Sequence, residues 1–184
     1  SIERHILRNY IYLHALEHGL DLPLGTQDAG LLDASTYDED VDVLVSWLRG
    51  HGGCTGKIAS YGVCLGGHLA LRAGFHEGIA AVAAYYPTDV HSATLGAGKS
   101  DDTLKRLGEM DAAMLFVWGR QDPHIPKEGR ERIHRTLEES ARAFEWHEFN
   151  AAHAFLRDEG PRYNPALARV CQAVLMRFLG EAVA

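Results

Sequence analysis

From residue 57 onward, short apolar runs alternate with stretches in which apolar residues recur every three or four positions. The short runs predict buried strands, and the periodic stretches predict helices. The predicted strands are Lys57–Tyr61, Ile79–Tyr85, Ala112–Trp118 and Phe144–Phe149, and helices are predicted after the first and third of them at Gly67–Phe75 and Lys127–Ala141. This alternation is typical of an α/β domain whose parallel sheet is flanked by helices.

The C-terminal helix has clear signals at both ends. Asn164 can cap its first turn, Pro165 suits the first helical position, and Gly180 follows the last apolar position. Its apolar stripe consists of Leu167, Val170, Cys171, Val174, Leu175, Phe178 and Leu179. Because Cys171 belongs to this stripe, we expect it in the core.

A second amphipathic helix is predicted over Tyr37–Arg49. Ser35 or Thr36 can cap it. Its inward face consists of Val41, Leu44, Val45 and Leu48. The acidic run at positions 38–40 then lies near the positive end of the helix dipole, so we interpret it as helix electrostatics rather than as a metal site.

Residues 1–34 form an atypical N-terminal segment. Residues 6–19 fit either an amphipathic helix that ends at Gly19 or a strand through Tyr10–Leu13, and the periodicity does not decide between them. Residues 20–34 have the composition of a loop. The chain contains no convincing linker or repeat, so we interpret residues 1–184 as a single domain.

Composition narrows the class of protein. An apolar content of 46% over 184 residues supports one substantial core. Three cysteines cannot all pair with one another, and neither a secretory leader nor a membrane-spanning run is evident, so we expect free thiols in a cytoplasmic protein with no membrane partner. The net charge of −7 argues against nucleic acid and favours a small-molecule partner. The histidines show no zinc-ligand spacing, so we expect no metal.

Gly62-Val63-Cys64-Leu65-Gly66 fits the nucleophile elbow G-x-S-x-G with cysteine in place of serine. It lies between a predicted strand and a predicted helix, as that motif requires. The turn is sharp enough that glycines must relieve crowding around the nucleophile, and the sulfur then lies near a helix N-terminus that favours a thiolate. The alternative interpretation is a glycine-rich packing turn around a buried thiol.

Two further residues follow successive predicted strands. Asp122 comes after the strand that ends at Trp118, and His153 lies in the loop beyond Phe149. Taken singly, Asp122 reads as a turn residue before Pro123 and His153 as a polar loop residue. The chain order of nucleophile, acid and histidine is however that of α/β hydrolases, and it predicts a catalytic triad.

With these motifs, residues 36–180 resemble the dienelactone hydrolase family, whose elbow carries cysteine followed by a doubled glycine, here Gly66-Gly67. The stretch AHAFLR around His153 also matches. The resemblance implies an α/β-hydrolase fold with a doubly wound, mainly parallel sheet, and hydrolysis of an ester or lactone that bears an acidic group, such as dienelactone. It also implies that Arg157, four residues after His153, holds the substrate carboxylate.

The expected chemistry needs no cofactor. His153, oriented by Asp122, draws the proton from Cys64, and the thiolate attacks the ester carbonyl to give a thioester. The backbone N–H of Leu65 holds the oxyanion.

Tyr85 and His124 are candidate substrate contacts, although a strand-end tyrosine and a turn histidine explain them equally well. Tyr86 ends the same strand and is a candidate on the same grounds, whereas His68 is expected to pack against a neighbouring segment.

The resemblance implies that this chain lacks strands that family members carry before the matched region. We therefore expect the Cys64 strand near an edge of the sheet, covered either by Tyr10–Leu13 or by a second subunit in a homodimer. Family members also draw a second oxyanion donor from the missing part. The competing hypothesis is therefore a catalytically silent domain that binds a ligand or serves as a structural remnant.

Overall fold

The computed structural model describes residues 6–7, 34–96 and 98–183, which contain a five-stranded sheet. The strands are β1 (Ile6–Leu7), β2 (Ile58–Val63), β3 (Ile79–Tyr85), β4 (Ala113–Gly119) and β5 (Phe144–Phe149). They lie side by side in chain order, and every pairing between neighbours is parallel. The carboxyl ends of the strands therefore meet at one edge, where parallel sheets place their functional sites.

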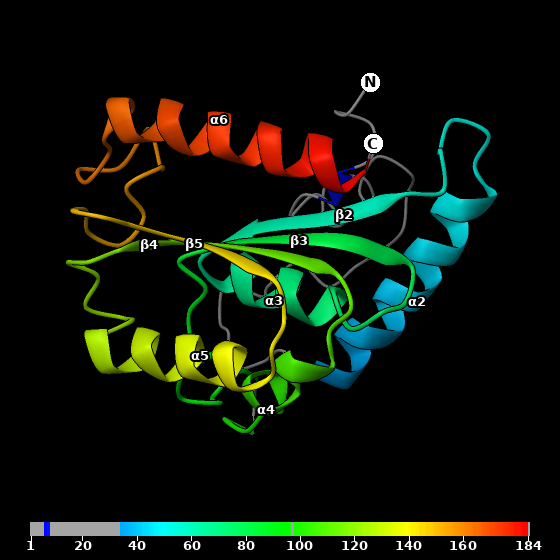
Figure 1. The fold of residues 1–184 in the computed structure, drawn as a ribbon, viewed down its shortest axis with the longest axis horizontal. Coiled ribbons are helices and arrows are strands. Elements are labelled where there is room, and N and C mark those ends of the chain that lie inside the picture. The colour runs from blue at the N-terminus through cyan, green and yellow to red at the C-terminus, as the bar shows by residue number, and fades with distance from the viewer. Residues whose placement is uncertain (1–5, 8–33, 97, 184) are drawn as a thin grey trace.

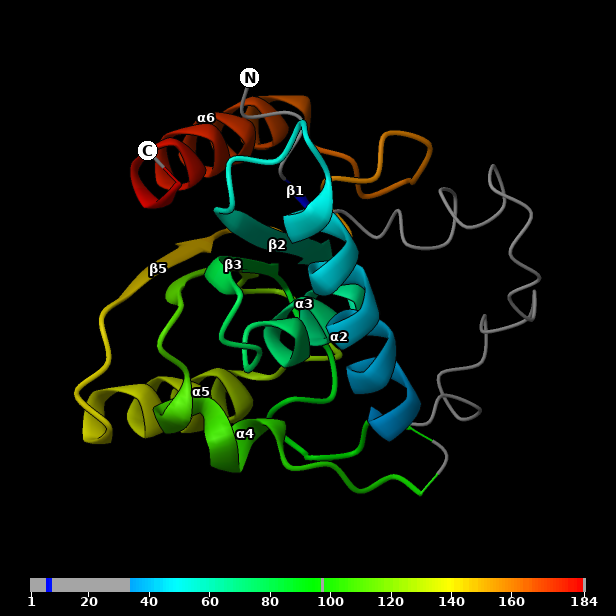
Figure 2. The same ribbon diagram turned by 90° about the vertical axis from the view of Figure 1, so that its right-hand side faces the viewer.

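Helices cover both faces of the sheet (Figure 1). The helices are α2 (Ala34–Gly50), α3 (Leu65–Ala73), α4 (Thr103–Arg106), the 3-10 turn η3 (Leu107–Glu109), α5 (Lys127–Glu139) and α6 (Pro165–Ala182). The helix α6 lies on one face, whereas α3 and α5 lie on the other with α2 beside α3 (Figure 2). Among the described residues, no helix combines the length and the apolarity that a membrane crossing requires.

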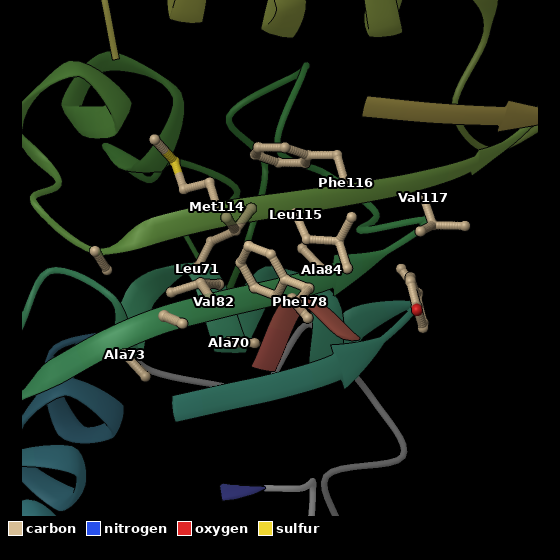
Figure 3. Close-up of a cluster of buried hydrophobic side chains, with 14 of the residues drawn as sticks. Ala70, Leu71, Ala73, Val82, Ala84, Met114, Leu115, Phe116, Val117 and Phe178 are labelled. Carbon is tan, nitrogen blue, oxygen red and sulfur yellow. The ribbon is translucent and has the colours of Figure 1, made fainter. Parts of the chain in front are cut away.

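The core lies on both sides of β3 and β4, which are almost entirely buried. Strands buried on both faces read as continuous apolar runs, and this explains the lack of alternation in their sequences. The close-up in Figure 3 shows Phe178 of α6 in the same cluster as Val82 and Leu115 of the sheet and Leu71 of α3. The predicted α/β architecture is confirmed, with helices on both faces of a parallel sheet.

Two helices differ from their predicted bounds. The helix α3 begins at Leu65 rather than Gly67, because the Cys64 carbonyl already accepts a hydrogen bond from the backbone N–H of His68. The helix α6 begins as predicted, with the Asn164 side chain accepting from the Leu167 N–H at 3.0 Å. It continues through Gly180 to Ala182, since a glycine inside a helix costs only about 1 kcal/mol relative to alanine. Val170 is 46% exposed and does not join the core stripe.

The predicted start of α2 is wrong. The helix already includes Ala34, so Ser35 and Thr36 lie inside it and cannot cap it, and its first turn contains no acidic residue. Asp38 instead accepts hydrogen bonds from the guanidinium of Arg72 on α3, with a distance of 2.9 Å from Nε to Oδ1. The acidic run therefore contributes to the contact between two helices.

The strand β2, which leads to Cys64, has β1 as its neighbour on one side. Ile6 and Leu7 pair with Ala59 and Ser60. The segment Tyr10–Leu13, predicted as the covering strand, lies outside the described residues. Within the described part of the chain, Ile6–Leu7 is the segment that pairs with this side of β2.

Candidate active site

Cys64 occupies a strained turn between β2 and α3. Its φ and ψ angles are 57° and −127°, outside the regions that non-glycine residues ordinarily adopt. A Cβ at Gly62 would lie 1.8 Å from the carbonyl oxygen of Gly66, so the glycine at position 62 lets the strand and the helix approach each other around the cysteine. Such strain is concentrated at functional sites. The turn has the geometry that the elbow motif predicts.

We expect Gly62→Ala to destabilise the fold by more than about 3 kcal/mol, because the added methyl group meets backbone atoms that cannot move aside. Thermal unfolding measures this effect. Gly50→Ala is the matched control, since a Cβ there would have no atom within 4 Å. Equal melting temperatures for the two variants would contradict this account of the turn.

The three predicted triad residues lie together at the carboxyl edge of the sheet. His153 Nε2 is 3.1 Å from Cys64 Sγ, and His153 Nδ1 is 2.6 Å from Asp122 Oδ2. The side chains of His153 and Asp122 are 6% and 1% exposed, whereas Cys64 is only partly buried. A partly exposed cysteine therefore lies next to a buried histidine–carboxylate pair.

Hydrogen bonds between the loops after β4 and β5 fix the positions of Asp122 and His153. The Gln121 N–H donates to the Ala151 carbonyl at 2.9 Å, and a Cβ at Gly119 would lie 2.4 Å from that same oxygen. Asp122 is held in turn by the backbone N–H of His124, which donates to Oδ1 at 2.8 Å. Oδ2 is therefore free to accept from His153.

Opposing influences set the charge of Cys64 and His153. Burial on its own would raise the pKa of the Cys64 thiol, but the hydrogen bond and charge of His153, with the Leu65 N–H and the Thr88 side chain, outweigh it and lower the pKa. Burial would lower the pKa of His153, but Asp122 and Cys64 outweigh it and raise the pKa to about 9. Each group thus favours the charged form of the other, a thiolate beside an imidazolium.

The site is lined by two further rings. The Tyr86 ring lies edge-to-face on His153 with centroids 5.0 Å apart, and the exposed His124 ring does so at 4.7 Å. Arg157 is exposed, and its side chain makes no hydrogen bond or ion pair to the residues that the structure describes. His124 therefore borders His153, and contact of Arg157 with a substrate stays a prediction.

Tyr85 does not lie at the site. Its side chain is 1% exposed, and its hydroxyl donates to the Cys171 carbonyl of α6 at 2.7 Å. The reason is the alternation of the strand, which points successive side chains to opposite faces. The following residue, Tyr86, contacts the histidine instead. Cys171 is buried as predicted, and burial raises the pKa of its thiol to about 11.

Thr88 is a site residue that the sequence did not reveal. It follows β3 at the same edge of the sheet, and its backbone N–H donates to the Cys64 carbonyl at 3.4 Å. Only its position after a strand could have indicated it, because no motif includes it. Among the described residues, no group of three or more histidine, cysteine, aspartate or glutamate side chains is placed to hold a metal ion.

The sequence of this chain matches one known protein family. The model of the "Dienelactone hydrolase family" matches residues 29–183. A "Putative carboxymethylenebutenolidase" of Saccharomyces cerevisiae is 37% identical over 76% of this chain and 54% of its own length. The "Carboxymethylenebutenolidase" of Pseudomonas sp. (strain P51) is 26% identical over 76% of this chain and 54% of its own. The chain thus spans about half the length of these relatives.

A solved structure supports the fold. The "Putative Dienelactone Hydrolase from Klebsiella pneumoniae" superposes with a TM-score of 0.71 over 80% of this chain and 61% of its own length. The sequence identity is 22%, so this likeness concerns the architecture of the sheet and helices. The architecture is therefore that of α/β hydrolases, as the elbow motif implies.

Proposed function

The chain belongs to the dienelactone hydrolase family, and from this premise we propose that it hydrolyses carboxylic ester or lactone bonds with Cys64 as the nucleophile. The observation that carries the proposal is the contact of Cys64 Sγ with His153 Nε2 at 3.1 Å, together with the bond from His153 Nδ1 to Asp122 at 2.6 Å. These are the distances of an activated nucleophile whose base is oriented by a third group.

The first step is acylation. The Cys64 thiolate attacks the carbonyl carbon, and the charge that develops on the carbonyl oxygen is stabilised by the backbone N–H of Leu65, the first residue of α3. The carbon–oxygen bond to the leaving group then breaks, and the His153 imidazolium gives its proton to the departing alkoxide. The product is a thioester on Cys64 and a neutral imidazole.

The second step is deacylation. Neutral His153 takes a proton from water, and the resulting hydroxide attacks the thioester carbonyl. The carbon–sulfur bond breaks, which restores the thiolate and releases the carboxylic acid. Asp122 keeps the imidazole in the orientation required for both transfers.

Leaving-group chemistry favours esters over amides as substrates. A thiolate leaves more readily than an amine, so an amide adduct would collapse back to the free thiolate. An alkoxide or enolate is protonated by His153 as its carbon–oxygen bond breaks, so the adduct of an ester goes on to the thioester. Activated esters and enol lactones are therefore the substrates that this site suits.

The substrate class can be tested at Arg157. We expect Arg157→Ala to raise KM about tenfold for an activated ester that carries a carboxylate, because a charge-assisted hydrogen bond is lost. A neutral ester with the same leaving group should be hydrolysed as before. Arg162→Ala is the matched control, since Arg162 is an exposed arginine of the same loop. Equal effects on the two esters would exclude a carboxylate contact at Arg157.

The pH dependence of kcat/KM follows from the ionisation of Cys64 and His153. As pH rises, activity should first increase when Cys64 loses its proton, at a pH below that of an ordinary thiol because its pKa is lowered. Activity should then fall around pH 9, where His153 loses the proton that the leaving group needs. Both limbs belong to the coupled pair rather than to one residue. A profile that continues to rise well above pH 9 would contradict the ion pair.

A further inference from the structure

The peptide group between Cys64 and Leu65 links the nucleophile to the proposed oxyanion donor. A peptide group is planar, so the Cys64 carbonyl and the Leu65 N–H lie in one plane and turn together. The φ angle of Cys64 is 57°, so the backbone that leads into this plane is strained. Groups that hold the Cys64 carbonyl therefore also determine where the Leu65 N–H points.

Three backbone N–H groups converge on the Cys64 carbonyl. Gly67 and His68, in the first turn of α3, donate to it at 2.9 and 3.3 Å. The third donor is the N–H of Thr88 at 3.4 Å, which belongs to the loop after β3. The first two contacts are set by the helix, but the third depends on where this loop lies.

The side chain of His68 ties the loop to α3. His68 is 0% exposed, and its Nδ1 is 2.7 Å from the Thr88 carbonyl oxygen. A carbonyl oxygen only accepts hydrogen bonds, so Nδ1 carries the proton and donates it to this contact. The imidazole therefore holds the same residue whose N–H reaches the Cys64 carbonyl.

Buried groups also hold the other nitrogen of the ring. His68 Nε2 lies 2.8 Å from Thr103 Oγ1 and 3.3 Å from Asp101 Oδ1. The Asp101 side chain is 0% exposed and accepts from the backbone N–H groups of Leu95 at 2.9 Å and Thr103 at 3.0 Å. Arg72, one turn further along α3, donates to Thr103 Oγ1 at 3.2 Å. The ring is thus fixed at both nitrogens.

We propose that His68, held by Asp101 and Thr103, is a positioning residue for the oxyanion donor. It keeps the loop after β3 against the elbow, so that the Cys64 carbonyl keeps its third hydrogen bond and the Leu65 N–H stays aimed at the developing oxyanion. His68 exchanges no proton in the reaction and acts only through the backbone of the elbow. The inference rests on the proposed function, because it assigns a role within the acylation step.

The expected size of the effect follows from the chemistry of the oxyanion. Removing one oxyanion donor costs about 10²–10³ in kcat. A donor that is misdirected rather than lost should cost less, so we expect about a 10- to 100-fold decrease in kcat when His68 no longer holds the loop. KM should change little, because the contact strengthens only when charge develops on the substrate oxygen.

Two substitutions of His68 separate its two ring contacts. In asparagine the side-chain amide takes the place of Nδ1, whereas in glutamine it takes the place of Nε2. We expect His68→Gln to show the loss of kcat for an activated ester and His68→Asn to retain most of the activity, since only asparagine can still donate to Thr88. His134→Gln is the matched control, because His134 is a partly exposed histidine of α5.

Alkylation of Cys64 by iodoacetamide distinguishes positioning from a general loss of structure. The thiolate attacks the saturated carbon of this reagent and displaces iodide, so no oxyanion forms. The alkylation rate of His68→Gln should therefore equal that of the unmodified protein, although its ester turnover is reduced. A disordered elbow would instead change both rates.

A second pair of variants tests the same contact from its outer side. Thr103→Val removes the hydroxyl that faces Nε2 and keeps the shape of the side chain. It should lower kcat in the same sense as His68→Gln, whereas Thr103→Ser should not. This comparison decides the matter if His68→Gln does not fold.

The outcomes separate this inference from the proposed function. If the unmodified protein does not hydrolyse the ester, the proposed function is wrong and the inference is wrong with it. If the ester is hydrolysed but His68→Gln and His68→Asn behave alike, or if ester turnover and alkylation fall together, the proposed function stands and the positioning role is refuted.

Discussion

Cys64→Ala is expected to reduce kcat/KM for an activated ester by at least about 10⁴-fold, the scale on which hydrolases lose activity when their nucleophile is removed. The physical reason is that the Cys64 sulfur, which lies 3.1 Å from His153 Nε2, forms the covalent acyl intermediate of the proposed reaction. The methyl group of alanine leaves the strained turn intact, because Gly62 still relieves the crowding there. Initial rates with an aryl ester measure the effect.

Cys54→Ser is the matched control for this loss. Cys54 is a free, partly exposed cysteine whose sulfur accepts from the Gly56 N–H at 3.4 Å, and a serine hydroxyl can accept the same bond. Its ester turnover should equal that of the unmodified protein. If Cys64→Ala were as active as this control, the nucleophile assignment would be wrong. If neither protein hydrolysed esters, a catalytically silent domain would be the better account.

His153→Ala is expected to lower kcat/KM by about 10³-fold, within the range that general acid–base groups contribute. The variant removes both the proton donor for the leaving group and the positive charge that favours the thiolate. Alkylation of Cys64 at neutral pH should slow as well, since the thiol pKa loses the influence that most opposes burial. Ester turnover and Cys64 alkylation are both measured on the same preparation of the variant.

His134→Gln serves as the control for His153. His134 lies on α5 with a side chain that is 41% exposed and an ion pair to Glu138 at 3.8 Å. Neither ester turnover nor Cys64 alkylation should change in this variant. The account would be contradicted if His153→Ala lost ester turnover while Cys64 kept its reactivity, because the two groups would then not be coupled.

Much of the fold could be predicted because its signals are local. The strands β3 and β5 have the bounds expected from their apolar runs, and α6 begins at the predicted cap on Asn164. The triad could be predicted because each member follows a strand of one parallel sheet, and such sheets gather the residues after their strands at one edge. The three side chains are within hydrogen-bond distance as expected.

The missed features depend on contacts between distant segments. The contact of Asp38 with Arg72 could not be predicted, because the two residues lie on different helices and are 34 positions apart in the chain. Tyr85 was expected at the site, but its hydroxyl reaches the backbone of α6 and the strand points it away. Thr88 and His68 carry no motif, and the contact between the Thr88 carbonyl and the His68 ring forms only when the loop after β3 folds against α3.

The most direct test of the central claim is to trap the acyl intermediate. The protein is mixed with an activated aryl ester, quenched with acid within the first turnover, and digested for mass spectrometry. The account predicts one acyl group per chain as a thioester on the peptide that contains Cys64. It also predicts that His153→Ala forms far less of this adduct within the same quench time. An ester hydrolysed without any acyl group on Cys64, or with the group on another residue, would contradict it.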